Sequence, residues 1–504
     1  MKRRKVLHLP GMLCACFMLC LLPLLYRNAF FDINRFKVEA VRIVVPVIGM
    51  VSAAAWLLVS RNRKIHTTIR NTDICVLLFA LTCFISSART GFDSASLIGN
   101  EGRYCGLWVM LSCALAYWLI SRNKIGLRLI GMLTVISAAL VALIGVLNAI
   151  GFDPLSFYPR LSHDQRAAFI STIGNINFFG VYVAMMLPLA LSHWINAENT
   201  PEKVLGLAAA ALMVLGVHAS RTDSAFLGMQ MAFLAMFALC GNSFKKMMRI
   251  LAFWAYSWVT IPLMGMLMNR GPEQFAYTGL LSMLCTTHMA EIVALILAGI
   301  ALAVRFFANK GMRPIGRNRL CVVCSVLLLL AIMLIILAIF LFTAVYDDVS
   351  LGAAADILRF DDNWGSSRGF VYKRSLRAFR DADWGDKAFG QGVDLAKRIL
   401  KPYDDNPHIN VVGVFNDAHC QPLQLLITCG IFGAFSFCGL LFFVFLDSVR
   451  ILEKSPEQLG ILCSICGYLP MMCLTVTQPI LMTTLFALCG YAQAQYRVSE
   501  EGNP

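Results

Sequence analysis

Charged side chains are scarce in this chain of 504 residues, and acidic ones are the scarcest. Only 14% of the residues are Asp, Glu, Lys or Arg, whereas 58% are hydrophobic. A water-soluble domain is nearer one quarter charged, so this chain has too little polar surface to enclose a core in water. The composition excludes an ordinary soluble protein. It predicts an all-α polytopic membrane protein, because backbone groups in lipid must pair within a helix.

The shortage of acidic residues leaves a formal net charge of +14. In a soluble protein this excess would suggest a nucleic-acid partner, but in a polytopic membrane protein Lys and Arg collect in the cytoplasmic loops. We therefore expect membrane lipids around the chain and no nucleic-acid partner. The 18 cysteines fall mostly inside apolar runs, so they do not indicate a disulfide framework.

Apolar runs recur along the whole chain and predict about 12–14 transmembrane helices. The run near Leu9–Tyr26 follows a basic start, Met1-Lys-Arg-Arg-Lys, and no A-x-A-like cleavage site comes after it. We expect a retained first helix with a cytoplasmic N-terminus. Basic residues then recur in the even-numbered connections, most densely in Arg305–Arg319, which agrees with that orientation.

One long hydrophilic segment, residues 346–415, interrupts the apolar pattern and mixes charges of both signs with aromatic residues. The sequence thus predicts three parts: an N-terminal transmembrane helix bundle (1–345), a large extracytoplasmic loop with short helices (346–415), and C-terminal transmembrane helices (416–504). The protein would lie in the cytoplasmic (inner) membrane, with a site on the outer face.

Several polar motifs gather, by this topology, on that outer face. They are GNEGRYCG (99–106), STIGNINFFG (171–180), HASRTDSAFLG (218–228), NWGSSRGFVYKRSLRAF (363–379), FGQG (389–392) and NDAHCQPLQLLITCGIFG (416–433). Each has a simpler explanation. Asn175 and Asn177 would cap a helix, and Arg221 would be a snorkelling arginine at the membrane interface. Their common face favours one shared site.

Arg368 differs from its basic neighbours in helical position. If residues 367–382 form a helix, Lys373, Arg377 and Arg380 share one stripe, whereas Arg368 falls on the aromatic side. A charge on a packed face needs a partner, so Arg368 is the better ligand candidate. The stripe is expected to face water or anionic lipid headgroups.

The order of the motifs resembles that of the O-antigen ligase and polymerase superfamily of bacterial membrane glycosyltransferases. IGNINFFGVYVAMMLPLAL is similar to the family's Gly-Asn-x-Asn helix start, and ASRTDSAFLG to its Ser-Arg motif. SSRGFVYKRSLRAF with FGQG resembles the start of its large periplasmic loop, and DAHCQPLQLLITCGIFG its closing pattern. The resemblance extends from Gly99 to Gly433. Cys420, where the family often has Asn, and Pro422 depart from it and bear on the substrate and subfamily.

This resemblance implies transfer of a glycan from an undecaprenyl diphosphate carrier to a hydroxyl acceptor on a glycan, lipid or protein, without a cofactor. Arg221 and Arg368, with Arg103 as a third, would bind the diphosphate, because a guanidinium group binds phosphate oxygens in bidentate fashion. His419 would take the proton of the acceptor hydroxyl as general base. The supporting residues are Asn175, Asn177, Asp417, Gly390 and Gly392.

Alternatives remain open at this point. His419 could instead be a histidine that only hydrogen-bonds a loop near a helix start. Asp381 and Asp383 have the D-x-D spacing of metal-dependent glycosyltransferases, although we expect no metal because the motif is short and its surroundings are polar throughout. A ligase and a repeat-unit polymerase share this chemistry. A flippase is the rival from another class, but it would carry its charges within the spans.

Overall fold

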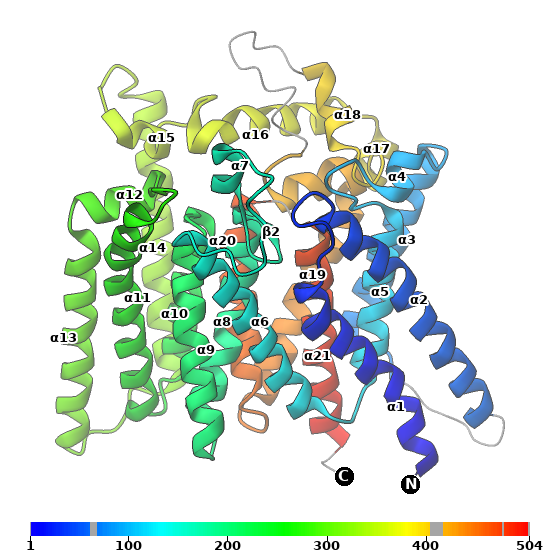
Figure 1. The fold of residues 1–504 in the computed structure, drawn as a ribbon, viewed down its shortest axis with the longest axis horizontal. Coiled ribbons are helices and arrows are strands. Elements are labelled where there is room, and N and C mark those ends of the chain that lie inside the picture. Colours follow the sequence, from blue (N-terminus) through cyan, green and yellow to red (C-terminus); the bar gives the residue numbers. More distant parts are fainter. Residues whose placement is uncertain (1, 61–67, 404–416, 476–477, 502–504) are drawn as a thin grey trace.

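The computed structural model describes residues 2–60, 68–403, 417–475 and 478–501. Within them, ten helices are long and apolar enough to cross a membrane, and three shorter ones, α5, α10 and α20, are also apolar. The protein is therefore an all-α, multi-pass membrane protein, as its composition predicts. Successive long helices run in alternating directions (Figure 1).

The helices of the first half are α1 (Lys2–Ala15), the π-helix η1 (Cys16–Leu21), the 3-10 helix η2 (Leu22–Leu24), α2 (Ile33–Ser60), α3 (Asn71–Arg89), α4 (Ser94–Ile98), α5 (Leu107–Ser121), α6 (Leu127–Ala149), α7 (His163–Ala168), α8 (Ile176–Asn196), α9 (Thr200–Ala219), α10 (Asp223–Leu239) and α11 (Phe244–Arg270). Two short antiparallel strands, β1 (Phe169–Ile170) and β2 (Gly174–Asn175), precede α8.

The second half consists of α12 (Gly279–Thr286), α13 (Met289–Asn309), α14 (Arg317–Ala344), the 3-10 helix η3 (Gly352–Ala354), α15 (Ala355–Leu358), α16 (Trp364–Asp381), α17 (Trp384–Phe389), α18 (Ala396–Leu400), the 3-10 helix η4 (Lys401–Tyr403), α19 (Gln421–Ile451), α20 (Gln458–Leu474) and α21 (Pro479–Glu501). The predicted large loop thus contains helices up to η4, and residues 404–415 of it lie outside the described residues. The predicted division into three parts remains a prediction.

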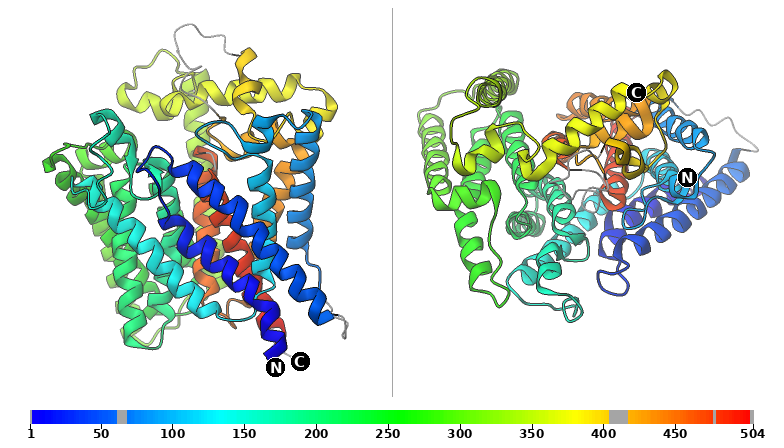
Figure 2. Two further views of the ribbon diagram at one scale, coloured as in Figure 1. Left: turned by 45° about the vertical axis from the view of Figure 1, so that its right-hand side comes forward. Right: turned by 90° about the horizontal axis from the view of Figure 1, so that it is seen from above.

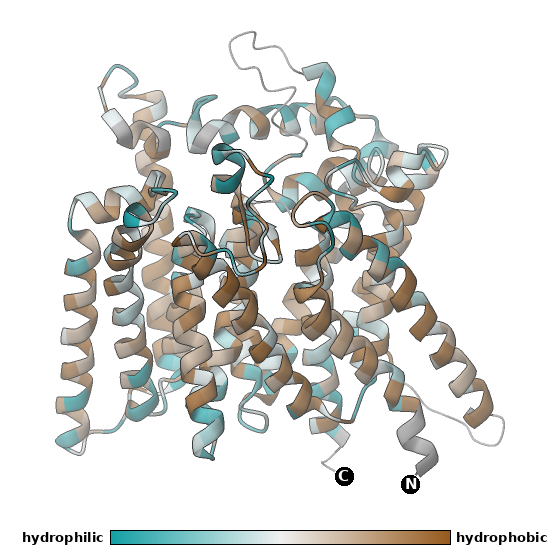
Figure 3. Ribbon diagram, in the orientation of Figure 1, coloured by the Kyte–Doolittle hydropathy of each residue, from teal (hydrophilic) through white to brown (hydrophobic). Residues whose placement is uncertain are grey.

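The helix α8 forms the centre of the bundle and packs against α9, α10 and α20. Its Phe179 and Tyr182 are fully buried. By contrast, most side chains of α14 are exposed although this helix is the most apolar of the long ones. Exposed apolar side chains at mid-height are expected where a helix faces lipid. Figure 3 shows the matching pattern, with hydrophobic residues along the helices and hydrophilic ones gathered toward both ends.

The bundle has two different ends. The helices α16, α17 and α18 lie across one end, which we call the loop face (Figures 1 and 2). At the opposite end, which we call the terminal face, α1 begins and α21 ends. Both of these helix ends therefore lie opposite the large loop. Which face is cytoplasmic remains a prediction.

Candidate active site

A cavity of about 270 Å³ lies at the loop face, where distant parts of the chain meet. The lining residues are Gly102, Arg103, Asn175, Asn177, Phe178, Arg368, Asp417, His419, Thr475 and Gln478. They come from the segment before α5, the start of α8, α16, the segment before α19, and the segment between α20 and α21. Six of the nine predicted site residues therefore share one cavity.

Asp417 joins the candidate base to a candidate cation. Its side chain is only 1% exposed and forms an ion pair with Arg103. Its Oδ1 accepts the backbone N–H of His419 at 2.6 Å and lies 2.5 Å from the ring Nδ1 of the same residue. A buried carboxylate is costly unless it is paired and hydrogen-bonded, and these contacts meet that need. One carboxylate thereby holds both functional groups.

His419 adopts the left-handed backbone conformation, with φ at 48°. Its Nδ1 faces Asp417, an arrangement in which Nδ1 carries the hydrogen and Nε2 is the nitrogen that accepts a proton. Burial, with the positive charges of Arg103 and Arg368, lowers the pKa of His419 to about 3. The imidazole is therefore neutral at pH 7, which is the form that a general base requires.

Two residues outside the predicted set hold the His419 segment in place. The hydroxyl of Tyr372 lies within hydrogen-bond distance of the carbonyl oxygens of His419, at 3.2 Å, and Cys473, at 2.6 Å. Gln424 accepts the N–H of Ala418 at 3.0 Å. The sequence offered a signal for both, since Tyr372 lies on the aromatic side of the predicted helix and Gln424 falls within the closing motif.

Arg368 reaches the cavity from α16 and donates only to neutral acceptors among its hydrogen bonds in the described structure. Its Nε donates to the carbonyl of Leu474 at 3.1 Å, and its Nη1 to that of Gly365 at 2.6 Å. Lys373 of the same helix instead pairs with Asp362 at 3.1 Å. Carbonyl groups orient a guanidinium group without neutralising it, so Arg368 can still attract an anion.

Arg103 depends on a buried residue that was not predicted. Asp394 accepts the N–H groups of Asn100, at 2.8 Å, and Cys105, at 3.1 Å, on either side of Arg103. Burial raises the pKa of Asp394 to about 6, and the positive charge of Arg103 opposes that rise. Asp394 thus holds the loop that carries Arg103. Its only signal in the sequence is a carboxylate two residues after the FGQG motif.

The two asparagines take part in a helix cap and also line the candidate site. Asn175 caps α8, and its Oδ1 accepts the N–H of Asn177 at 2.9 Å. Both residues also line the cavity. The capping role fixes the start of α8, and the same geometry presents two amide side chains to whatever occupies the cavity.

Arg221 is not among the residues that line this cavity. It lies in the turn between α9 and α10, with φ at 55°. Its Nη2 donates to the carbonyl of Ala167 at 2.5 Å, and its guanidinium group stacks over the ring of Phe275 at 4.4 Å. These contacts tie the turn to α7 and to the segment before α12. A role for Arg221 in diphosphate binding remains a prediction.

Gly390 and Gly392 also lie away from the cavity, where α17 meets a break in α19. Gly390 has φ at 87°, and a Cβ there would lie 2.2 Å from the carbonyl oxygen of Thr428. The N–H of Gly392 donates to Ser86 at 2.9 Å. Gly430, inside α19, has φ at 68°, and a Cβ there would meet the backbone of α17 at 2.4 Å. Gly390 and Gly430 allow α17 and α19 to pack backbone against backbone, so their support of the site is indirect.

The two carboxylates of the D-x-D motif have separate partners. Asp381 pairs with Arg380 at 3.1 Å. Asp383 caps α17 through the N–H of Asp386 at 2.7 Å and lies 3.5 Å from Arg89. In the described ranges, no group of three or more His, Cys, Asp or Glu side chains is placed to hold a metal ion. The motif therefore stabilises the loop face through ion pairs and a helix cap.

Residues 274–438 match the family model described as O-antigen ligase. No curated protein matches the chain. The matched segment carries Arg368, Asp417 and His419, together with the break in α19. Arg103 and the two asparagines reach the same cavity from earlier parts of the chain.

Proposed function

Because the chain belongs to the O-antigen ligase and polymerase superfamily, we propose that it moves a glycan from an undecaprenyl diphosphate carrier to a hydroxyl acceptor. The reaction would take place at the outer face of the cytoplasmic membrane. The observation that carries this proposal is the meeting of His419, Arg103 and Arg368 at one cavity on the loop face. A base and two cations are what the transfer requires.

The arginines would act on the leaving group. As the bond between the anomeric carbon and the diphosphate oxygen breaks, its electron pair moves onto the diphosphate. Cations already aimed at those oxygens lower the barrier, because they need no reorganisation during the reaction. Arg368 supplies such a charge directly. Arg103 shares its charge with Asp417, so we assign it the weaker contribution.

His419 would act on the acceptor. Its Nε2 takes the proton of the hydroxyl group while the hydroxyl oxygen attacks the anomeric carbon. A base whose pKa is held low by burial and by two arginines is weak before the donor binds. The bound diphosphate would bring negative charge beside those arginines and raise the pKa of His419 again. The base would thus become strong only when the donor is in place.

Ligase and polymerase differ in the acceptor and share every step above, so the cavity supports both. A flippase is less well supported, because the ionisable groups of this cavity gather at the loop face, whereas a transporter places its key charges within the spans.

The test is transfer of a labelled glycan by purified protein supplied with undecaprenyl diphosphate-linked donor and candidate acceptors. We expect His419→Ala to reduce turnover on the order of 10²–10⁴-fold while donor binding changes little. His288→Ala is the matched control, since His288 is 79% exposed on the same face and does not line the cavity. Near-normal transfer by correctly folded His419→Ala protein would contradict the proposed base. The product that forms, a long chain on a new acceptor or an extended repeat, would separate ligase from polymerase.

A further inference from the structure

A second cavity lies at the terminal face, at the opposite end of the bundle from the candidate active site. Its volume is about 550 Å³. The lining residues are Thr68, Ile69, Arg70, Asn71, Phe443, Asp447, Arg450, Arg497 and Glu500. They come from the start of α3 and the ends of α19 and α21. The proposed reaction uses none of them.

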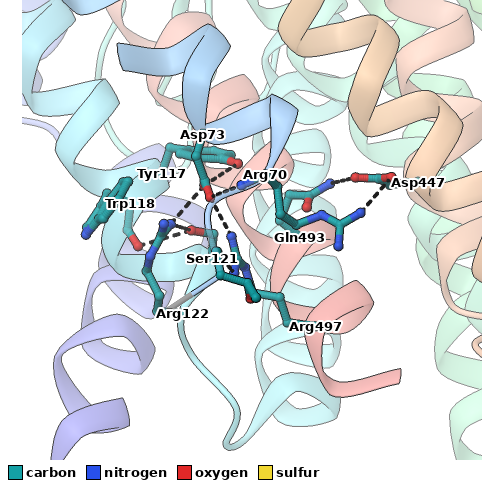
Figure 4. A network of polar contacts seen from close by, with 10 residues as sticks. Arg70, Asp73, Tyr117, Trp118, Ser121, Arg122, Asp447, Gln493 and Arg497 are labelled. Carbon is teal, nitrogen blue, oxygen red and sulfur yellow. Dashed lines mark hydrogen bonds and ion pairs between the residues drawn. The ribbon is translucent and has the colours of Figure 1, made fainter. Parts of the chain in front are cut away.

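Asp447 of α19 is the acidic centre of one group of polar contacts at this cavity. It accepts from Arg70 at 3.1 Å and from Arg450 at 3.2 Å. Gln493 of α21 donates to its other oxygen at 3.0 Å. Arg70 also lies 3.9 Å above the ring of Tyr496, so its position is fixed from two sides. Figure 4 shows Arg70 and Gln493 converging on Asp447 from different helices.

Asp73, on the first turn of α3, is the acidic centre of a second group of polar contacts. It accepts from Arg497 at 2.7 Å and from Arg122 at 3.0 Å, and the hydroxyl of Tyr117 donates to it at 3.1 Å. Arg497 also donates to the carbonyl of Thr68 at 2.8 Å. These contacts bring Arg497 to the start of α3 beside Arg70 (Figure 4).

The cluster carries more positive than negative charge. Each of the two aspartates is shared by two arginines, and adding Glu500 at the cavity does not balance the four guanidinium groups. Arg497 is only 8% exposed, yet its Nε has no hydrogen-bond partner among the described residues. The same holds for Nε of Arg70. Arg450, which accounts for the surplus, is 63% exposed at the cavity, and an excess of positive charge at such a position attracts an anion.

The start of α3 also favours a bound anion in this cavity. Arg70 to Asn71 line the cavity where this helix of 19 residues begins. The N–H groups of the first turn and the helix dipole attract negative charge at such a position. Three arginines and a helix start therefore face the same space from α3, α19 and α21.

We propose that this cavity binds the phosphate group of an anionic lipid headgroup, held by Arg70, Arg450 and Arg497. The cavity lies where long apolar helices end, which is where lipid headgroups are expected to begin. Basic pockets between such helices select anionic headgroups by charge and hydrogen bonding. A network that only ties the helices together would not need the surplus of arginine. This binding is independent of the proposed glycosyl transfer.

The test compares the purified full-length protein in nanodiscs of phosphatidylcholine with and without phosphatidylglycerol. Bound lipid is counted by native mass spectrometry, and the melting temperature is measured in parallel. We expect saturable binding of phosphatidylglycerol and a higher melting temperature. Arg450→Gln should weaken the binding about fivefold, because a surface arginine contributes on the order of 1 kcal/mol to anionic lipid binding. Arg450 is 63% exposed, so its removal should leave the fold intact.

Lys454→Gln is the matched control, since it removes the same charge from an exposed position shortly after α19 without touching the cavity. Normal affinity in this control together with weaker binding in Arg450→Gln would support the site. Equal losses in both variants, or equal binding of the two lipids, would overturn it. A separate arm adds inorganic phosphate. Displacement of the lipid by millimolar phosphate would identify phosphate itself as sufficient, whereas resistance would assign the site to the complete headgroup.

Discussion

The neutrality of one imidazole decides what the loop-face site can do. His419 lies between a carboxylate beside its Nδ1 and two arginines, which together with burial disfavour its charged form. Positive charge nearby lowers the pKa of a histidine because it destabilises the imidazolium. The arginines proposed to bind the donor therefore also contribute, after burial, to keeping the proposed base neutral.

This link predicts the pH dependence of the reaction. In the free enzyme the pKa of His419 is lowered to about 3, so protonation of His419 should not reduce kcat/KM near the ordinary histidine value of about 6.5. Replacing Arg368 by Gln removes one positive charge, which should raise the pKa and move the acidic limb to higher pH. The measurement is kcat/KM between pH 4 and 8, with thermal unfolding as a check on the fold.

Arg380→Gln provides the control for that experiment. Arg380 lies on the same helix, is 75% exposed and pairs with Asp381. Its removal should leave the pH profile unchanged. Identical profiles for wild type and Arg368→Gln would show that Arg368 does not affect the protonation of His419.

Among the elements, α19 has the most unusual geometry. It starts with Pro422 in its first turn, where a missing N–H does no harm, and this accounts for one departure from the family pattern. It then breaks at Gly430, where the backbone is not helical. The break leaves room for the short helix α17, and Gln391 donates to the carbonyl of Ile427 there. Part of the loop face is thus anchored in the membrane helix that carries His419 at its start.

Gly430→Ala should damage this anchor. A Cβ would clash with the backbone of Ala388 at 2.4 Å, and the left-handed conformation adds strain. We expect a loss of about 1–3 kcal/mol in stability, seen as a lower melting temperature in detergent. Gly299→Ala is the control, because a Cβ at this position of α13 meets nothing within 4 Å. Equal melting temperatures for the two variants would mean that α17 can shift away from the added Cβ without loss of stability.

The sequence predicted most of this site because its residues stand at helix starts. His419 and the asparagines each precede an apolar run, and the alternation of helices then brings those starts to one face. Asp394 could not be found in this way, because its partners are nearly 300 residues earlier and nothing local marks them. Gly390 and Gly392 were noticed, but their partner in the broken helix is also a distant contact. Helix register does not show whether Arg221 lines the cavity or lies in a turn away from it, so the sequence could not place this residue.

At the scale of the whole molecule, the two faces carry different kinds of charge cluster. The loop face holds a histidine, arginines and amides around a small cavity. The terminal face holds arginines sharing aspartates between helices. The surplus of basic residues at helix ends of the terminal face is the pattern expected of a cytoplasmic side.

The orientation can be measured by labelling with a membrane-impermeant maleimide in intact cells. Trp384→Cys lies on the loop face, where Trp384 is 84% exposed, and should be labelled above the background of the native thiols. Lys454→Cys, exposed at the terminal face, should be labelled only after the membrane is opened. The reverse labelling pattern would mean that the membrane orientation is the opposite one, with the candidate active site on the cytoplasmic side.

The sharing of Asp417 has a consequence for how this site can change over evolutionary time. Arg103 and His419 contact the two oxygen atoms of the same buried carboxylate, so a substitution at either one alters the surroundings of the other. Their effects should therefore be strongly non-additive, as expected for residues that act as a unit. A lineage that lost Asp417 would keep little benefit from retaining the other two. The three positions should be inherited, or abandoned, together.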